Sequence, residues 1–305
     1  PTRRNGYSRT VTQRKPLTMS SISATFTAAD TDLSAAHQAQ SIWRQPRHGQ
    51  RLTQVDAIAT EAPVALQYNG INHAVLLATP TFLEDLALGF SFTEGIIRPA
   101  SDIYDITLQQ NAQGYVVDIE IASACLNQLK QRRRQLAGRT GCGLCGLESL
   151  SEVQRDLPIL APPIHRYSPT AVFAALDQLR AKQPLHQITG ATHAAGWADL
   201  NGTIHVVRED VGRHNALDKL IGQLLSQSSL VINQGLIVVS SRASFEMVQK
   251  TAAIGVPALV AVSAPTSYAK HIAEELGLLL IAFGREKQFS AYSHAEYLTE
   301  EDHAS

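Results

Sequence analysis

Two of the three cysteines in this 305-residue chain, Cys142 and Cys145, are separated by two residues and lie among three glycines. Glycine adds no side chain and accepts positive φ angles, so the stretch predicts a loop with little cover over the sulfur atoms. Nearby cations lower a thiol pKa, and the thiolate is the nucleophile. No acidic residue lies between Glu120 and Glu148, and a basic run precedes the pair: Lys130, Arg132, Arg133, Arg134 and Arg139. The pattern indicates a reactive sulfur on a flexible segment.

Three other interpretations of the cysteine pair stay open. A closed structural zinc site needs four ligands, whereas the remaining cysteine, Cys125, is isolated and no His-x3-His motif lies near the pair. A thioredoxin-like dithiol should open a helix directly after a strand, whereas this pair follows a basic polar run. A surface loop without chemistry is the third interpretation, and the glycine spacing argues against it.

The composition describes a globular chain with enough apolar material for a sizeable core, since 44% of the residues are hydrophobic and 17% are charged. The formal net charge of −1 gives no general basic field for nucleic acid or membranes. No apolar run approaches the ~18 residues that span a bilayer, and no hydrophobic signal segment is visible. Few cysteines favour a reducing compartment, and we expect a cytoplasmic protein.

The first half of the chain predicts a basic disordered tail over residues 1–40 and a β-rich domain over residues 41–135. Asn69-Gly70 between two apolar stretches predicts a hairpin, and a second hairpin should turn at 111–114. Between them, Thr79 and Pro80 predict the N-cap and first residue of a helix, with Glu84 and Asp85 in or near its first turn.

The second half predicts a cysteine loop and linker over residues 136–165 and an α/β domain over residues 166–300. Ser168-Pro169 should open its first helix. Strands are expected at 203–207, 236–239, 258–262 and 278–283, and helices at about 215–226, 243–254 and 266–276. Apolar strands that alternate with helices predict a largely parallel sheet in three layers. The fold class is therefore α/β, or α+β overall.

Polar residues follow three of these strands. Ser240, Ser241 and Arg242 follow the second, residues 263–267 follow the third, and Arg285 follows the fourth. Ligands of open α/β sheets bind outside the carboxyl ends of the strands, and helix N-termini with arginines suit phosphate. We expect a phosphate-bearing ligand at this edge.

A second polar group comprises residues 208–215 with His193 upstream. His, Asp and Arg together could form a hydrolytic or metal site, although no deaminase zinc signature is present. The alternative is a buried hydrogen-bonded network that fixes the start of a helix.

Five stretches that lie in order along the chain form a recognisable set: Leu88–Ile97, Thr140–Gly146, Thr192–Gly196, Glu209–Lys219 and Ser240–Lys250. Together they resemble the FdhD family of formate dehydrogenase accessory sulfurtransferases. The resemblance implies a sulfur carrier that accepts a persulfide from a cysteine desulfurase. It would pass the sulfur to the molybdenum cofactor, bis(molybdopterin guanine dinucleotide), before that cofactor enters formate dehydrogenase.

The resemblance also implies residue roles. Cys142 would carry the persulfide and Cys145 would assist, with no metal of the protein's own. The guanine dinucleotide would contact Phe283, Gly284, Arg285, Glu286, Lys287 and Gln288, of which Gly284 and Gln288 are less typical of the family. The C-terminal domain would resemble the cytidine deaminase fold without its zinc ligands, and two copies would form a homodimer. A non-enzymatic cofactor-binding chaperone and a zinc-stabilised interaction module remain the alternatives.

Overall fold

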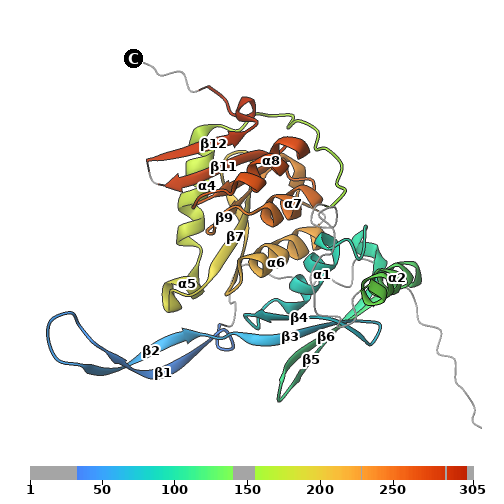
Figure 1. Cartoon of the computed structure of the whole chain (residues 1–305). Helices are drawn as coiled ribbons and strands as arrows, with labels where there is room; N and C mark the ends of the chain where they lie inside the picture. Colours follow the sequence, from blue (N-terminus) through green and yellow to red (C-terminus); the bar gives the residue numbers. More distant parts are fainter. Residues whose placement is uncertain (1–32, 140–154, 228, 286, 301–305) are drawn as a thin grey trace, which may run out of the picture. The chain divides into compact units, whose positions relative to one another are not determined.

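The structure is a computed structural model that describes residues 33–139, 155–227, 229–285 and 287–300, apart from the side chains of 133–139 and 285. The cysteine pair therefore lies outside the described residues. The strands in chain order are β1 (His37–Arg44), β2 (Leu52–Ala59), β3 (Ala62–Tyr68), β4 (Ile71–Ala78), β5 (Ile103–Asn111), β6 (Gly114–Ile121), β7 (His193–Ala198), β8 (Ile204–Asp210), β9 (Leu236–Val239), β10 (Ala258–Ala261), β11 (Leu279–Arg285) and β12 (Gln288–Ser293) (Figure 1). The α-helices are α1 (Leu83–Thr93), α2 (Ser123–Arg139), α4 (Pro169–Ala181), α5 (Pro184–Thr189), α6 (Arg213–Ser226), α7 (Phe245–Ala253) and α8 (Ser267–Leu276).

The first half forms a four-stranded sheet in the order β4-β3-β6-β5. Asn69 and Gly70 both have positive φ angles, 51° and 76°, which confirms the predicted β3–β4 hairpin turn. The second hairpin is also confirmed, because Asn111 pairs with Gly114 across its turn. Apolar residues that alternate along these strands pack against α1. This sheet and α1 have a hydrophobic core of their own.

Helix α1 begins later than the sequence predicts. Its N-cap is Phe82, in the left-handed region, and Thr79 makes no capping bond to α1. Thr79 is fully buried, and its hydroxyl accepts a hydrogen bond from the backbone N–H of Val211 at 3.2 Å. The predicted cap at Thr79 is therefore wrong, because a contact 132 residues away in the chain takes the hydroxyl. The predicted acids in the first turn, Glu84 and Asp85, are confirmed.

Two further elements adjust the predicted boundaries. Strand β1 begins at His37, inside the stretch that we expected to be a disordered tail, and pairs with β2 as a two-stranded sheet. The basic run lies on α2, where Leu129 is buried and Arg132 is exposed. This arrangement matches a helix with one buried side and one solvated side.

The second half forms a six-stranded sheet in the order β12-β11-β10-β9-β7-β8. Only β9, β10 and β11 are parallel neighbours, while β7, β8 and β12 join antiparallel. The prediction of a largely parallel sheet is therefore wrong. We expected no strand at 193–198 or 288–293, and both of these stretches form strands that pair antiparallel with their neighbours. The predicted strands at 203–207, 236–239, 258–262 and 278–283 are all present; 236–239 has the predicted bounds, and the other three have shifted ends.

Helices cover both faces of this sheet. Helix α4 packs with Val238, Val260 and Ile281 on one face, and its N-cap Ser168 accepts from Ala171 N, as predicted. Helices α6, α7 and α8 pack with the alternate residues Ile237 and Leu259 on the other face. The mixed α/β class is thus present. Within the described residues, no helix is long and apolar enough to cross a membrane.

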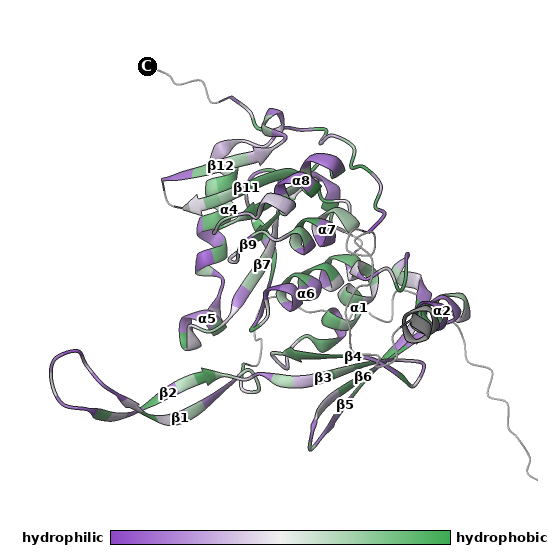
Figure 2. Ribbon diagram, in the orientation of Figure 1, coloured by the Kyte–Doolittle hydropathy of each residue, from purple (hydrophilic) through white to green (hydrophobic). Residues whose placement is uncertain are grey.

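Helices α1 and α6 join the two halves at very short range. A Cβ atom at Gly89 would lie 1.8 Å from the carbonyl oxygen of Asp218, and one at Gly222 would lie 1.9 Å from that of Asp85. Only glycine lets the two backbones approach this closely. Figure 2 shows mostly hydrophobic residues along α1. This contact fixes the first sheet against the second.

Candidate functional site

The described residues that flank the cysteine pair are Arg139, at the end of α2, and Arg155. The backbone N–H of Arg155 donates to Oε1 of Gln249 on α7 at 3.4 Å. Gln249 precedes Lys250, a buried lysine. Arg155, the first described residue after the cysteine pair, is therefore held on α7 at the neighbour of a charged group.

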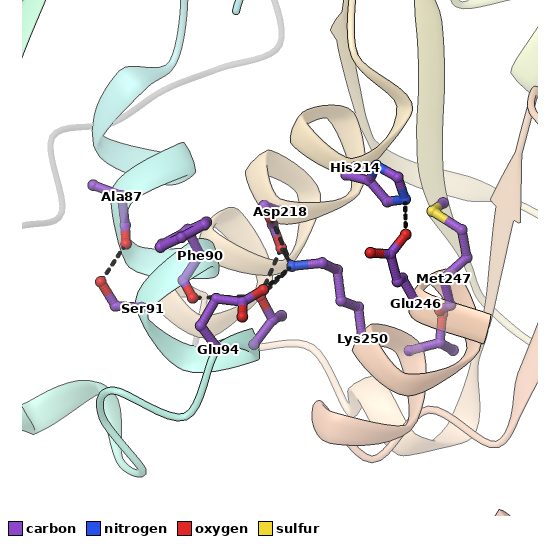
Figure 3. A network of polar contacts seen from close by, with 11 residues as sticks. Ala87, Phe90, Ser91, Glu94, His214, Asp218, Glu246, Met247 and Lys250 are labelled. Carbon is purple, nitrogen blue, oxygen red and sulfur yellow. Dashed lines mark hydrogen bonds and ion pairs between the residues drawn. The ribbon is translucent and has the colours of Figure 1, made fainter. Parts of the chain in front are cut away.

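Lys250 is the centre of a buried polar network (Figure 3). Its Nζ donates to Thr93 Oγ1 at 2.9 Å, Glu94 Oε1 at 2.9 Å and Asp218 Oδ1 at 3.0 Å. Burial opposes the charge on Lys250, but Asp218 and Glu94 outweigh it and raise the pKa of the ammonium group. The network links α1, α6 and α7, and Lys250 stays charged inside it.

A second network explains most of the polar group at residues 208–215. Lys219 Nζ contacts Asp210 Oδ2 at 2.6 Å, and both side chains are fully buried. Asp210 also accepts from Thr79 N at 3.0 Å and from Asn215 Nδ2 at 3.0 Å. Burial lowers the pKa of Lys219, while Asp210 acts in the opposite direction. This arrangement matches the buried network that fixes a helix start, rather than a catalytic centre.

The two histidines of that polar group are separated. His214 pairs with Glu246 at 2.7 Å (Figure 3), whereas His193 lies at the start of β7 and lines a cavity. Burial, aided by Arg213 and His186, lowers the pKa of His193, so its imidazole is neutral at neutral pH. No group of three or more metal-ligating side chains is present within the described ranges.

The cavity that His193 lines has a volume of about 450 Å³ and lies at the carboxyl ends of the parallel strands. Ser240 follows β9, Val262 follows β10, and Gly284 lies in β11. Helices α4 and α5 and the segment before β7 supply the opposite wall, with Asp177, Arg180, His186 and Thr192. An open-ended cavity with an arginine, two histidines and hydroxyl groups suits a polar, anionic ligand.

The predicted ligand residues at the end of β11 fall in different places. Gly284 lines the cavity, and a Cβ there would lie 2.8 Å from the methyl groups of Leu176, so glycine permits the close approach of α4. Phe283 has a positive φ of 54° and packs against the hydrophobic core. Lys287 and Gln288 are exposed at the β11–β12 connection, and Arg285 pairs with Gln288 through the backbone. Glu286 lies outside the described residues.

The predicted pair after β9 does not line the cavity. Ser241 is buried, and its hydroxyl donates to the carbonyl of Arg242 at 3.0 Å. Arg242 is exposed. The neighbouring Ser240 lines the cavity instead, where its hydroxyl accepts from Ala194 N at 2.9 Å. The shift of one residue arises because successive side chains of an extended segment point to opposite sides.

Sequence reasoning missed the wall formed by α4, α5 and Thr192. Glu209 holds this wall in place, since its carboxylate accepts from Leu185 N at 2.9 Å, His186 N at 2.8 Å and Thr192 Oγ1 at 3.1 Å. The sequence contains both Thr192-His193 and Glu209, but it does not show that they meet. Only the antiparallel pairing of β7 with β8 and β9 brings these residues to the strand ends.

The remaining cysteine differs from the pair in its surroundings. Cys125 lies on α2, and its Sγ donates to Asp102 Oδ2 at 3.4 Å. Burial and the Asp102 carboxylate raise the pKa of this thiol. A raised pKa leaves little thiolate at neutral pH, so Cys125 is a poor nucleophile.

Comparison with known proteins shows which family the chain resembles. Residues 59–299 match the model of the FdhD/NarQ family. A protein of Bordetella bronchiseptica named sulfur carrier protein FdhD is 52% identical over 247 residues, which cover 80% of this chain and 87% of that protein. A protein of Cupriavidus necator with the same name is 52% identical over 263 residues, covering 86% of this chain and 90% of that protein.

A solved structure from Desulfotalea psychrophila, assigned as a formate dehydrogenase accessory protein, superposes with a TM-score of 0.66. It is 23% identical and covers 87% of this chain and 100% of its own. At this identity the likeness shows a shared fold.

Proposed function

This chain belongs to the FdhD/NarQ family, and from that premise we propose that it is a sulfur carrier protein that serves formate dehydrogenase. The observation that carries the proposal is the extent of the match. It runs from residue 59 to residue 299, and so includes Cys142 and Cys145, and about half of the residues are identical to those of curated sulfur carriers.

In the proposed reaction, the thiolate of Cys142 attacks the outer sulfur of a persulfide on a cysteine desulfurase. The sulfur–sulfur bond of the donor breaks, the donor cysteine leaves as a thiolate, and a persulfide forms on Cys142. Cys145 can then attack the inner sulfur, which releases hydrosulfide and leaves a Cys142–Cys145 disulfide. A cellular dithiol would reduce this disulfide and return the carrier to its starting state.

The proposed acceptor is the molybdenum cofactor in its bis(molybdopterin guanine dinucleotide) form, held as cargo. The cavity at the strand ends is our candidate for a nucleotide part of this cargo. Arg180 and His186 supply cationic or donor groups for phosphate, and Ser240 and Thr192 supply hydroxyl groups. Gly284 also lines the cavity. We also propose that two copies assemble as a homodimer.

Mass spectrometry of the full chain tests the sulfur transfer. After incubation with a cysteine desulfurase and cysteine, the parent should gain sulfur at Cys142, and Cys142→Ala should gain none and fail to activate formate dehydrogenase. Cys145→Ala should be impaired less, because it still accepts the persulfide. Cys125→Ala is the matched control and should behave as the parent, since its thiol has a raised pKa.

Full activation of formate dehydrogenase by Cys142→Ala would contradict sulfur transfer and favour a non-enzymatic cofactor chaperone. Zinc bound in stoichiometric amount through both cysteines would instead favour an interaction module. Metal analysis of the purified chain separates that alternative from the other two.

A further inference from the structure

The stretch Leu88–Ile97 ends in a turn on which arginines converge from three parts of the chain. Arg132 on α2 donates from Nη1 to the carbonyl oxygen of Gly95 at 3.3 Å. Arg155, the first described residue after the cysteine pair, lies against the same glycine. Arg98 follows the turn and donates its backbone N–H to Asp102. The turn thus gathers cationic groups from the segment after α1, from α2 and from Arg155.

Gly95 makes the close packing of Arg155 possible. A Cβ atom at Gly95 would lie 2.4 Å from Nη2 and 3.3 Å from Cζ of Arg155, and the φ angle of Gly95 is +64°. The positive φ angle favours glycine, and the missing side chain leaves room for the guanidinium of Arg155 against the turn.

Among the described residues, no carboxylate forms a direct ion pair with the side chain of Arg98, Arg132 or Arg155. Glu94, the acid of the turn, already contacts Lys250 at 2.9 Å. Burial lowers the pKa of Arg155, Glu94 and Asp218 oppose that effect, and the neighbouring charges of Arg132 and Arg98 add to it.

One buried donor of the three arginines, Nη1 of Arg155, makes no hydrogen bond to the described part of the chain. A buried N–H group without an acceptor is costly, and a charged one more so. Arg98 and Arg132 are exposed and Arg155 is partly buried, so an anion can reach the group from solvent.

We propose that Arg98, Arg132 and Arg155 form an anion-binding site on the Glu94–Arg98 turn, and that its ligand carries a phosphate or diphosphate group. A guanidinium group can bind two phosphate oxygens at once, and three such groups together suit a diphosphate. This site is separate from the cavity at the strand ends, which none of its residues lines. The proposal does not depend on sulfur transfer.

Calorimetry of the full chain with inorganic diphosphate at low salt tests the site. The parent should bind, and Arg132→Gln and Arg155→Gln should each weaken binding by about tenfold, the loss expected for one charge-assisted hydrogen bond. Arg47→Gln removes an exposed arginine between β1 and β2, and should bind as the parent. Hydrogen exchange should slow at residues 94–98 when diphosphate is present.

Two results would overturn the proposal: no binding of diphosphate to the parent, or equal affinity for diphosphate in the parent and both site variants. A thermal unfolding curve for each variant shows whether a loss comes from unfolding, and Arg155→Lys, which keeps the charge and loses Nη1, should still bind more weakly than the parent. GDP identifies the source of the phosphate: an equal loss of GDP affinity in the site variants assigns the nucleotide's own diphosphate, whereas unchanged GDP affinity assigns a separate phosphate.

Discussion

Replacing Lys219 by methionine should strongly destabilise the fold. The change keeps an unbranched side chain of similar length and removes the ammonium group that lies 2.6 Å from Asp210 Oδ2. Both side chains are completely buried, so the Asp210 charge would remain inside the protein without its counter-ion. Removing one partner of a buried pair costs roughly 3–5 kcal/mol. Lys219 also donates to Thr79 O at 2.8 Å, and this carbonyl would lose its donor.

The cost can be measured by urea unfolding and by the melting temperature. At roughly 2–4 °C per kcal/mol for a domain of about this size, the expected fall in melting temperature is roughly 6–20 °C. Lys219→Met combined with Asp210→Asn removes the isolated charge and should recover a large part of the loss. Lys270→Met serves as the control, because Lys270 forms an exposed pair with Glu274 and should matter little.

Two results would refute this reasoning. One is a loss of less than about 1 kcal/mol in the single variant, which would mean that water or a neighbouring group replaces the ammonium. The other is a double variant as unstable as the single one. That result would attribute the loss to packing rather than to the buried charge.

Three further predictions concern the junction, the cavity and the basic helix. Gly89→Ala should cost about 1–3 kcal/mol in urea unfolding, because its Cβ would overlap the Asp218 carbonyl oxygen; an unchanged midpoint would contradict the close contact. His193 has a pKa below its usual value of 6.5, mainly through burial, so the unfolded chain binds more protons and stability should fall as pH drops below about 6.5. His193→Gln should flatten that fall in melting temperature, and an identical pH profile would show that His193 does not contribute. Glutamine at all three positions of 132–134 should slow alkylation of Cys142 at neutral pH and low salt, with the difference disappearing at high salt; equal rates at low salt would make the basic run only a helix surface.

Local signals in the sequence determined many elements of this protein. Asn69-Gly70 specifies a hairpin because both residues accept positive φ angles, and Ser168-Pro169 opens α4 through a serine cap. The short apolar runs at 236–239 and 258–262 appear as buried strands. The cysteine pair, its glycines and the preceding arginines can be recognised without any structure, because they lie within one short stretch of the sequence.

Tertiary structure alone decided which of these elements meet. Strand β7 was not predicted, yet its antiparallel insertion beside β9 brings Thr192 and His193 to the carboxyl ends of the parallel strands. Thr79 has the sequence signature of a helix cap, but its hydroxyl accepts from Val211 instead. The buried Lys219 and Lys250 look like ordinary surface lysines in the sequence. Their burial depends on Asp210 and Asp218, and on backbone and hydroxyl groups more than a hundred residues away, at Thr79 and Thr93. Local propensity cannot encode contacts at that separation, because they form only when α1 and α6 pack together.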